Sequence, residues 1–127
     1  MSFFGWGNRS YNSPSTGAIS NPSTATLIAE VDLNSTMGMV KSGGAPFQVS
    51  WIVGAGTTLA TFYFEQALST GLGDTAIRDH TAVLVSSGQS AQFVTKHNVE
   101  PGDRFRIRVG SSLTGSVVGK IIAEPLI

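Results

Sequence analysis

Two histidines, His80 and His97, are the side chains of this sequence best suited to acid–base or metal chemistry. Asp79 directly precedes His80, but neighbouring residues on a strand point to opposite faces, so the two are not preset as a catalytic pair. Asp74, Asp79 and His80 could form a weak oxygen-rich metal site in one loop. The stronger interpretation is that Asp74 caps a turn, that Arg78 and Asp79 are solvated, and that His80 begins a strand. The sequence has no Cys, no G-x-S-x-G elbow and no phosphate-binding loop. We therefore expect no catalytic residue, no metal site and no cofactor.

Three arginines, Arg104, Arg106 and Arg108, form the sharpest charge feature of the chain. Spaced two apart on a strand, they share one face at intervals of about 6.8 Å. One interpretation is an anion-facing stripe that binds acidic side chains of a partner in an assembly, and this is our prediction. The alternative is a solvated outer strand face crossed by Glu or Asp from a neighbouring strand. Aromatic residues do not alternate with the arginines on that face, so we do not expect nucleic acid as a partner.

The first 24 residues differ in composition from the rest of the chain, because 16 of them are Ser, Asn, Gly, Pro or Thr. Such a composition does not build a core, but large rings supply contact area at low entropic cost. We predict that residues 1–24 form an extended docking arm. Its partner-binding residues are four aromatics: Phe3, Phe4, Trp6 and Tyr11. A neighbouring subunit is the preferred contact, and packing onto the arm's own domain is the alternative.

The composition bounds the remaining possibilities. At 127 residues the chain has room for one core, so residues 25–127 form one domain. Only 13% of the residues are charged, and eight basic residues balance eight acidic ones, which suits a subunit of an assembly better than a free monomer. No apolar run approaches the ~20 residues of a membrane span, and the N-terminus does not resemble a signal peptide. We expect no membrane partner and assembly in a cytoplasm.

After residue 24 the sequence is typical of an all-β protein. Apolar and β-branched runs separated by turn residues predict strands at 25–33, 37–41, 46–53, 57–67, 80–86, 90–97, 103–109 and 115–123. About eight short strands without a convincing helix favour a jelly-roll-like antiparallel β-sandwich with an extended N-terminal arm. Residues 65–79 are expected to be a long connection, because Gly71 and Gly73 interrupt any helix there.

Period-two alternation assigns the core faces. Phe105, Ile107 and Val109 share one face of 103–109, opposite the arginines. Two further sets share faces of their strands: Phe47, Val49, Trp51 and Val53, and Leu27, Ala29, Val31 and Leu33. We expect Trp51 to fill the core rather than line a sugar site. Tyr63 is expected to point outward or toward another subunit.

The whole pattern resembles the small head decoration, or cement, proteins of tailed bacteriophages. The stretches that carry the resemblance are TLIAEVDL, FQVSWIVG, ALSTGLGDTAIRD and VEPGDRFRIRV, within a Cys-free sandwich that follows an aromatic-bearing arm. The resemblance implies a homotrimer on the outer face of a virion head that holds neighbouring capsomers together. It implies the major capsid protein as partner and the capsid surface as location, but it carries over no functional residue.

Two further function classes remain as hypotheses beside the structural virion subunit. One is a jelly-roll recognition module that binds a receptor or a sugar in a phage tail or fibre, and exposed aromatics with Asp or Asn in a concave patch would favour it. The other is an enzyme of the cupin or hydrolase kind, which ranks last because cupin chemistry needs a His-rich metal cluster.

Overall fold

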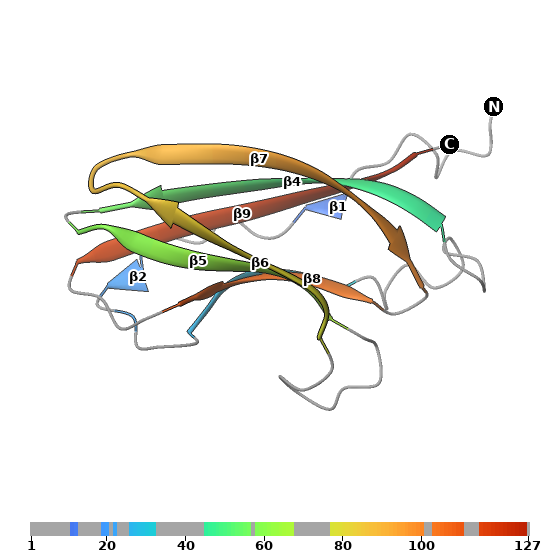
Figure 1. Ribbon diagram of the computed structural model, residues 1–127, viewed down its shortest axis with the longest axis horizontal. Helices are drawn as coiled ribbons and strands as arrows, with labels where there is room; N and C mark the ends of the chain where they lie inside the picture. Colours follow the sequence, from blue (N-terminus) through green and yellow to red (C-terminus); the bar gives the residue numbers. More distant parts are fainter. Residues whose placement is uncertain are drawn as a thin grey trace.

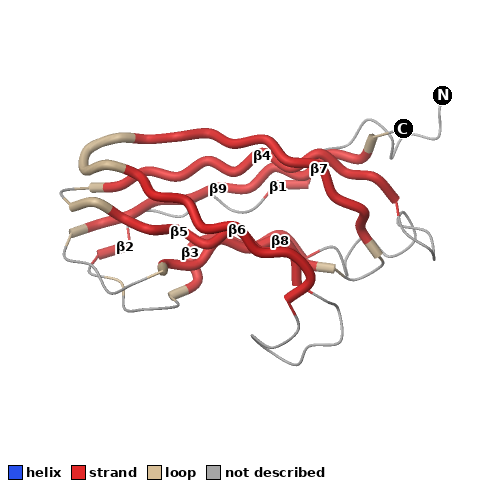
Figure 2. Tube along the Cα trace, in the orientation of Figure 1, coloured by secondary structure: helices blue, strands red, loops and turns tan. Residues whose placement is uncertain are grey.

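The computed structural model describes residues 11–12, 19–20, 22, 26–32, 45–56, 58–67, 77–100, 103–110 and 115–126. They form two antiparallel sheets packed face to face (Figures 1 and 2). The described strands are β1 (Tyr11–Asn12), β2 (Ile19–Ser20), β3 (Leu27–Asp32), β4 (Ala45–Ala55), β5 (Ala60–Ala67), β6 (Ile77–Val85), β7 (Ser90–Val99), β8 (Arg104–Val109) and β9 (Ser116–Pro125). The expected all-β sandwich is confirmed. The expected strand 37–41 lies outside the described residues.

The strand order is that of a jelly roll. Sheet A has the order β1-β9-β4-β7, with β2 also paired to β9, and sheet B has the order β3-β8-β5-β6. From β3 to β9 the chain changes sheet at every step except the one from β5 to β6. The first and last described strands, β1 and β9, lie in the same sheet. The crossing connections hold the inner faces of the two sheets against each other.

Residues expected to form an arm complete sheet A. Tyr11 and Asn12 pair with Ala123 and Ile122, and Ile19 and Ser20 pair with Val117 and Ser116. On its other side β9 pairs with β4. The short strands therefore supply the second partner that the backbone of β9 needs. This corrects the preference for a neighbouring subunit at these two segments, which pair with their own domain.

The core follows the predicted alternation in most strands. Phe47 and Val49 are fully buried, as are Phe105, Ile107 and Val109. Trp51 is 1% exposed, which confirms its expected place in the core. Gly119 of β9 lies where the sheets approach closely, because a Cβ there would be 2.8 Å from Cγ2 of Ile28.

Two expectations are wrong in detail. A register shift between Leu27 and Ala29 buries Ile28 and leaves Leu27 46% exposed, because a bulge moves the alternation on by one residue. The expected connection 65–79 is too long at both ends: β5 ends at Ala67, where the expected strand 57–67 ends, and β6 already begins at Ile77. The charged and polar residues that end β5, Glu65 and Gln66, are buried because partners on other strands satisfy them.

Candidate functional site

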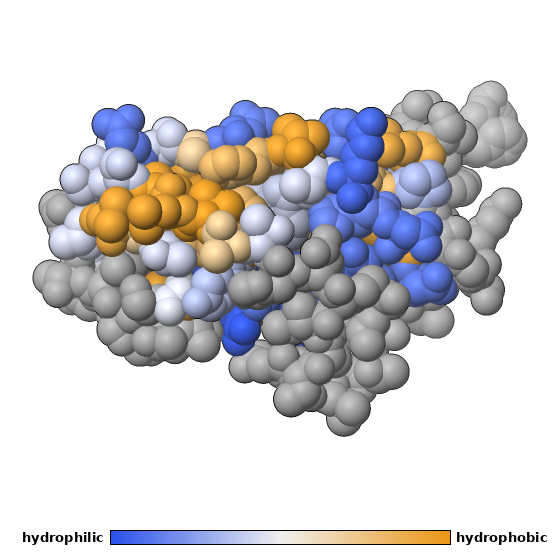
Figure 3. All heavy atoms as spheres, viewed as in Figure 1, coloured by the Kyte–Doolittle hydropathy of each residue, from blue (hydrophilic) through white to orange (hydrophobic). Residues whose placement is uncertain are grey.

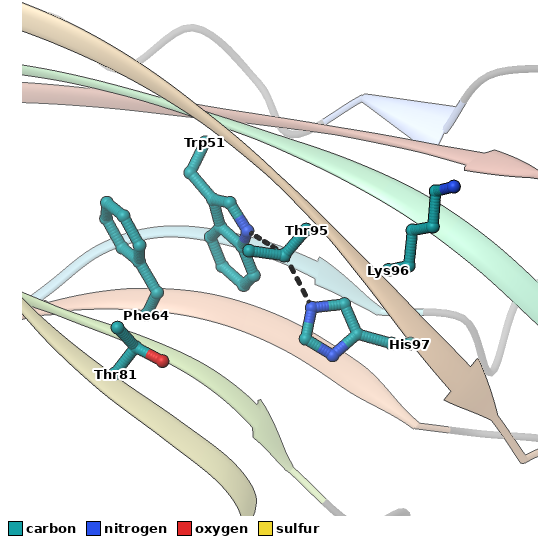
Figure 4. Close-up of a pocket in the computed structure, with 6 residues that line it drawn as sticks. All are labelled: Trp51, Phe64, Thr81, Thr95, Lys96 and His97. Atoms are coloured by element: carbon teal, nitrogen blue, oxygen red, sulfur yellow. Dashed lines mark hydrogen bonds between the residues drawn. The ribbon is translucent and has the colours of Figure 1, made fainter.

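A pocket opens between the edge strands of the two sheets. It has a volume of about 250 Å³ and is lined by Trp51 of β4, Phe64 of β5, Thr81 of β6, and Thr95, Lys96 and His97 of β7 (Figure 4). β7 is the last strand of sheet A and β6 is the last strand of sheet B. The pocket therefore lies at the open side of the sandwich, where none of the described strands covers the space between the layers.

The alternation of β7 explains which of its side chains face this space. Thr95 and His97 are half-buried, whereas Val94, Lys96 and Asn98 between and beside them are exposed. In a strand of the core the inward positions would all be apolar. Here a hydroxyl and an imidazole occupy them, because this stretch of β7 faces a gap rather than a filled interior.

A chain of two hydrogen bonds runs along the pocket wall. The indole N–H of Trp51 donates to Thr95 Oγ1 over 2.7 Å, and Thr95 Oγ1 lies 2.6 Å from His97 Nε2 (Figure 4). An indole nitrogen can only donate, so Thr95 Oγ1 must accept this bond and its own hydrogen is available to His97. The buried indole thereby fixes the rotamer of a hydroxyl on the pocket wall.

Aromatic rings form the floor of the pocket. Trp51 and Phe64 stack with centroids 4.9 Å apart and an interplanar angle of 8°. The ring of His97 packs at 5.2 Å from Phe105 and meets Trp51 edge-on at 6.2 Å. Because these rings also belong to the core, the floor is rigid and largely apolar, while the wall above it carries the polar groups.

The polar groups aimed into the pocket are neutral or weakly basic. Thr81 and Thr95 contribute hydroxyls and His97 an imidazole, whereas the ammonium group of Lys96 extends to the other side of β7 (Figure 4). None of the lining residues that the structure describes carries a carboxylate. In the part of the chain that the structure describes, no group of three or more His, Asp or Glu side chains could hold a metal ion. The arrangement suits an uncharged polar ligand.

The arginine stripe lies elsewhere and is used within the chain. On the outer face of sheet B, Glu65 of β5 is fully buried and accepts from Arg106 Nε and Arg108 Nη2, each over 2.8 Å. Arg104 lies 3.7 Å from Glu30 of β3. This corrects the prediction of an anion-facing stripe for a partner. The alternative, crossing by Glu from neighbouring strands, is the one that the structure bears out, although the face is buried rather than solvated.

The structure does not describe several of the predicted residues. Phe3, Phe4 and Trp6 of the arm lie outside the described residues, as do Asp74 and the side chain of Tyr11. Asp79 and His80 are on β6, but their side chains are outside the description. The arm and metal hypotheses at these positions stay predictions. Nor does any helix in the described ranges have the length and apolarity needed to cross a membrane.

Sequence reasoning missed most of the pocket. From the sequence, His97 is a candidate only for acid–base or metal chemistry, and Trp51 is expected in the core. Thr81, Thr95 and Phe64 carried no signal for a site. The sequence does contain one signal, since one face of the strand carries Phe93, Thr95 and His97. Polar side chains at the inward-facing positions of a strand indicate that it does not face a filled core.

The fold is shared with known carbohydrate-binding modules. It is similar to the CBM22-1 xylan-binding domain from Paenibacillus barcinonensis Xyn10C, with a TM-score of 0.60 and 12% identity over 93% of each chain. A CBM4 structure matches with a TM-score of 0.61 and 7% identity over 89% of this chain and 77% of that one. At such identities the likeness shows the fold alone.

The same fold also occurs in a virus particle. One chain of a human norovirus GI.7 virus-like particle matches with a TM-score of 0.57 and 11% identity, over 98% of this chain and 32% of that longer one. No protein-family model matches the sequence. Nor does any curated protein match it.

Proposed function

We propose that this chain is a non-catalytic recognition module that binds carbohydrate in the pocket between β6 and β7. The observation that carries the proposal is the mixed chemistry of the pocket lining, in which the half-buried Thr95 hydroxyl and His97 imidazole lie beside Trp51 and Phe64, which are 1% and 4% exposed. Sugars present apolar C–H faces and hydroxyls on the same ring. A pocket that binds them needs both kinds of surface within a few ångströms.

The hydrogen-bonding groups suit hydroxyl ligands. A Thr hydroxyl and a neutral imidazole can each donate and accept, as a sugar hydroxyl can. The bond from the Trp51 indole holds Thr95 in place before a ligand arrives, so less rotamer entropy is lost on binding. The similarity in fold to a xylan-binding domain supports the class of ligand.

Binding without turnover fits the lining of the pocket. Glycoside hydrolysis ordinarily uses two carboxyl groups that flank the scissile bond, whereas none of the six lining residues is Asp or Glu. The non-enzyme interpretation therefore stands as part of this proposal.

A glycan array probed with the full chain tests the proposal. We expect retention on a defined set of glycans and at least a tenfold loss of affinity in Thr95→Val, which keeps the side-chain shape and removes the hydroxyl. The matched control is Gln92→Ala, an exposed position on the same strand but outside the pocket, which should bind normally. Absence of retention on every glycan, with the chain folded, contradicts the proposal.

A second candidate is the structural virion subunit, as a homotrimer on the major capsid protein. The observation that favours it is exposed apolar side chains on the two edge strands, since Leu84 of β6 is 63% exposed and Val94 of β7 is 54% exposed. Figure 3 shows apolar surface on this side of the molecule. Apolar residues on edge strands are typical of contact surfaces. The likeness to a chain of a norovirus particle supports this candidate at the level of the fold.

Light scattering on the purified chain separates the two candidates. The virion proposal expects a trimer, or a monomer that becomes a trimer on capsid particles, and expects Leu84→Ser with Val94→Ser to weaken it. Exchange of the exposed Ala82 for Ser is the control. A monomer that does not bind capsid particles but binds glycans supports the recognition module alone.

A further inference from the structure

The pocket between β6 and β7 is closed toward the turn that joins these strands. Both strands diverge from that turn, as Figures 1 and 2 show. The backbone N–H of Gly88 donates to the carbonyl of Gly56 over 2.6 Å, and the N–H of Ala55 donates to the carbonyl of Gln89 over 2.9 Å. These bonds hold the turn against the end of β4. An extended polymer therefore has no exit on this side.

Phe93 narrows the space just inside the turn. Its ring lies 5.6 Å from the ring of Phe64, centroid to centroid. Phe93 belongs to β7 of sheet A and Phe64 to β5 of sheet B, so the contact crosses from one sheet to the other. Phe93 does not itself line the pocket, but through this contact with Phe64, which does, it connects the two sheets next to the pocket on the turn side.

A polar bridge closes the opposite side. The side-chain amide of Gln66 on β5 donates to the backbone carbonyl of Asn98 on β7 over 2.9 Å, and also to Asp103 Oδ2 over 2.9 Å. Asp103 accepts in addition from the backbone N–H of Glu100. Gln66 is 2% exposed and Asp103 is fully buried. Buried polar groups with satisfied partners hold their geometry, so this bridge is a fixed boundary.

The distance between the two walls is short. From Phe93 to Asn98 the strand advances about 17 Å at ~3.4 Å per residue, and side chains of both walls occupy part of that length. The volume of the pocket is about 250 Å³, which falls below the ~300–1,000 Å³ of pockets for drug-sized ligands. The space fits one sugar ring between two walls, with its remaining substituents toward the mouth.

We infer that the pocket takes a single terminal sugar residue, at the end of a glycan chain or as a free monosaccharide, and not an internal segment of a polysaccharide. The inference rests on the proposed function and specifies its ligand class. An internal segment of a polysaccharide must enter the pocket on one side and leave it on the other. The Phe64–Phe93 contact and the Gln66–Asn98 hydrogen bond block these two sides. The glycan is therefore bound by its end, and its terminal sugar ring contributes most of the binding free energy.

Titration with ligands of increasing length tests the inference. The probes are xylose, glucose and galactose, each compared with its β-1,4-linked trisaccharide and hexasaccharide, by isothermal calorimetry on the full chain. In any series that binds, we expect the affinities for the monosaccharide, the trisaccharide and the hexasaccharide to agree within about threefold. A rise of tenfold or more with length shows several subsites and overturns the inference while the proposed function stands. Absence of binding in all three series and on the glycan array contradicts the proposed function, and the inference fails with it.

Removal of one wall gives a second test on the same ligands. Phe93→Ala opens the turn side of the pocket. We expect this variant to bind the hexasaccharide at least fivefold more tightly than the monosaccharide of the same series. Val94→Ala is the matched control, since Val94 is the next residue on β7 and is 54% exposed, whereas Phe93 contacts Phe64 across the sheets; the control should show no length dependence. A folded Phe93→Ala variant without length dependence contradicts the role of this wall.

Discussion

The indole nitrogen of Trp51 lies 2.7 Å from the hydroxyl oxygen of Thr95, 44 positions further along the chain. The two residues occupy neighbouring strands, β4 and β7, in which Trp51 faces Phe93 in the register and Thr95 faces Val49. The bond is therefore diagonal across the pair of strands. It joins the core to the pocket wall, so a substitution at Thr95 has consequences for both stability and binding.

We expect Thr95→Val to lower the free energy of unfolding by about 1–3 kcal/mol, because the Trp51 N–H loses its acceptor in a buried position. Thr95→Ser keeps the hydroxyl and should recover most of that loss. Urea unfolding followed by tryptophan fluorescence measures both variants. Equal stability of Thr95→Val and the unchanged chain contradicts a structural role for the bond.

Glu65→Ala should destabilise the fold by about 3–5 kcal/mol, because it leaves Arg106 and Arg108 buried without the carboxylate between them. The control is Glu30→Ala. The Glu30 side chain is 29% exposed and lies 3.7 Å from Arg104, so its loss should cost at most about 1 kcal/mol. Chemical denaturation compares the two. Similar small losses in both variants would show that the Glu65 cluster behaves as a surface ion pair.

Deletion of residues 1–24 should lower the melting temperature and promote self-association. It removes β1 and β2 and leaves the backbone of β9 without its second partner. Deletion of residues 1–10 keeps both strands and is the matched control. Calorimetry and light scattering give the two readouts. A monomeric 25–127 chain as stable as the control contradicts a role for these strands in the sheet.

Gly119→Ala is expected to cost about 1–3 kcal/mol, since the added methyl group would lie 2.8 Å from Ile28 Cγ2 between the packed sheets. The cost should shrink in an Ile28→Ala background, where the space is vacant. A double-mutant cycle on unfolding free energies measures the coupling. Additive costs would show that another contact is responsible.

The sequence by itself determined the strands and most of their faces. The expected strands 46–53 and 103–109 correspond to Ala45–Ala55 and Arg104–Val109, because alternation of apolar and polar residues has the period of the strand. It also placed Arg104, Arg106 and Arg108 on one outer face. It could not show that Glu65 lies among them, since a residue's partner on a neighbouring strand depends on the register between strands.

Only the tertiary structure decided where the chain begins its sheet and where the pocket lies. A two-residue strand such as β1 has too few residues for a pattern, and it exists because β9 offers unpaired backbone groups. The pocket unites Trp51, Phe64, Thr81 and Thr95 from four strands. Their proximity follows from the order of strands in the two sheets. Local periodicity contains no information on that order, because hydrogen bonds between strands form equally well in many pairings.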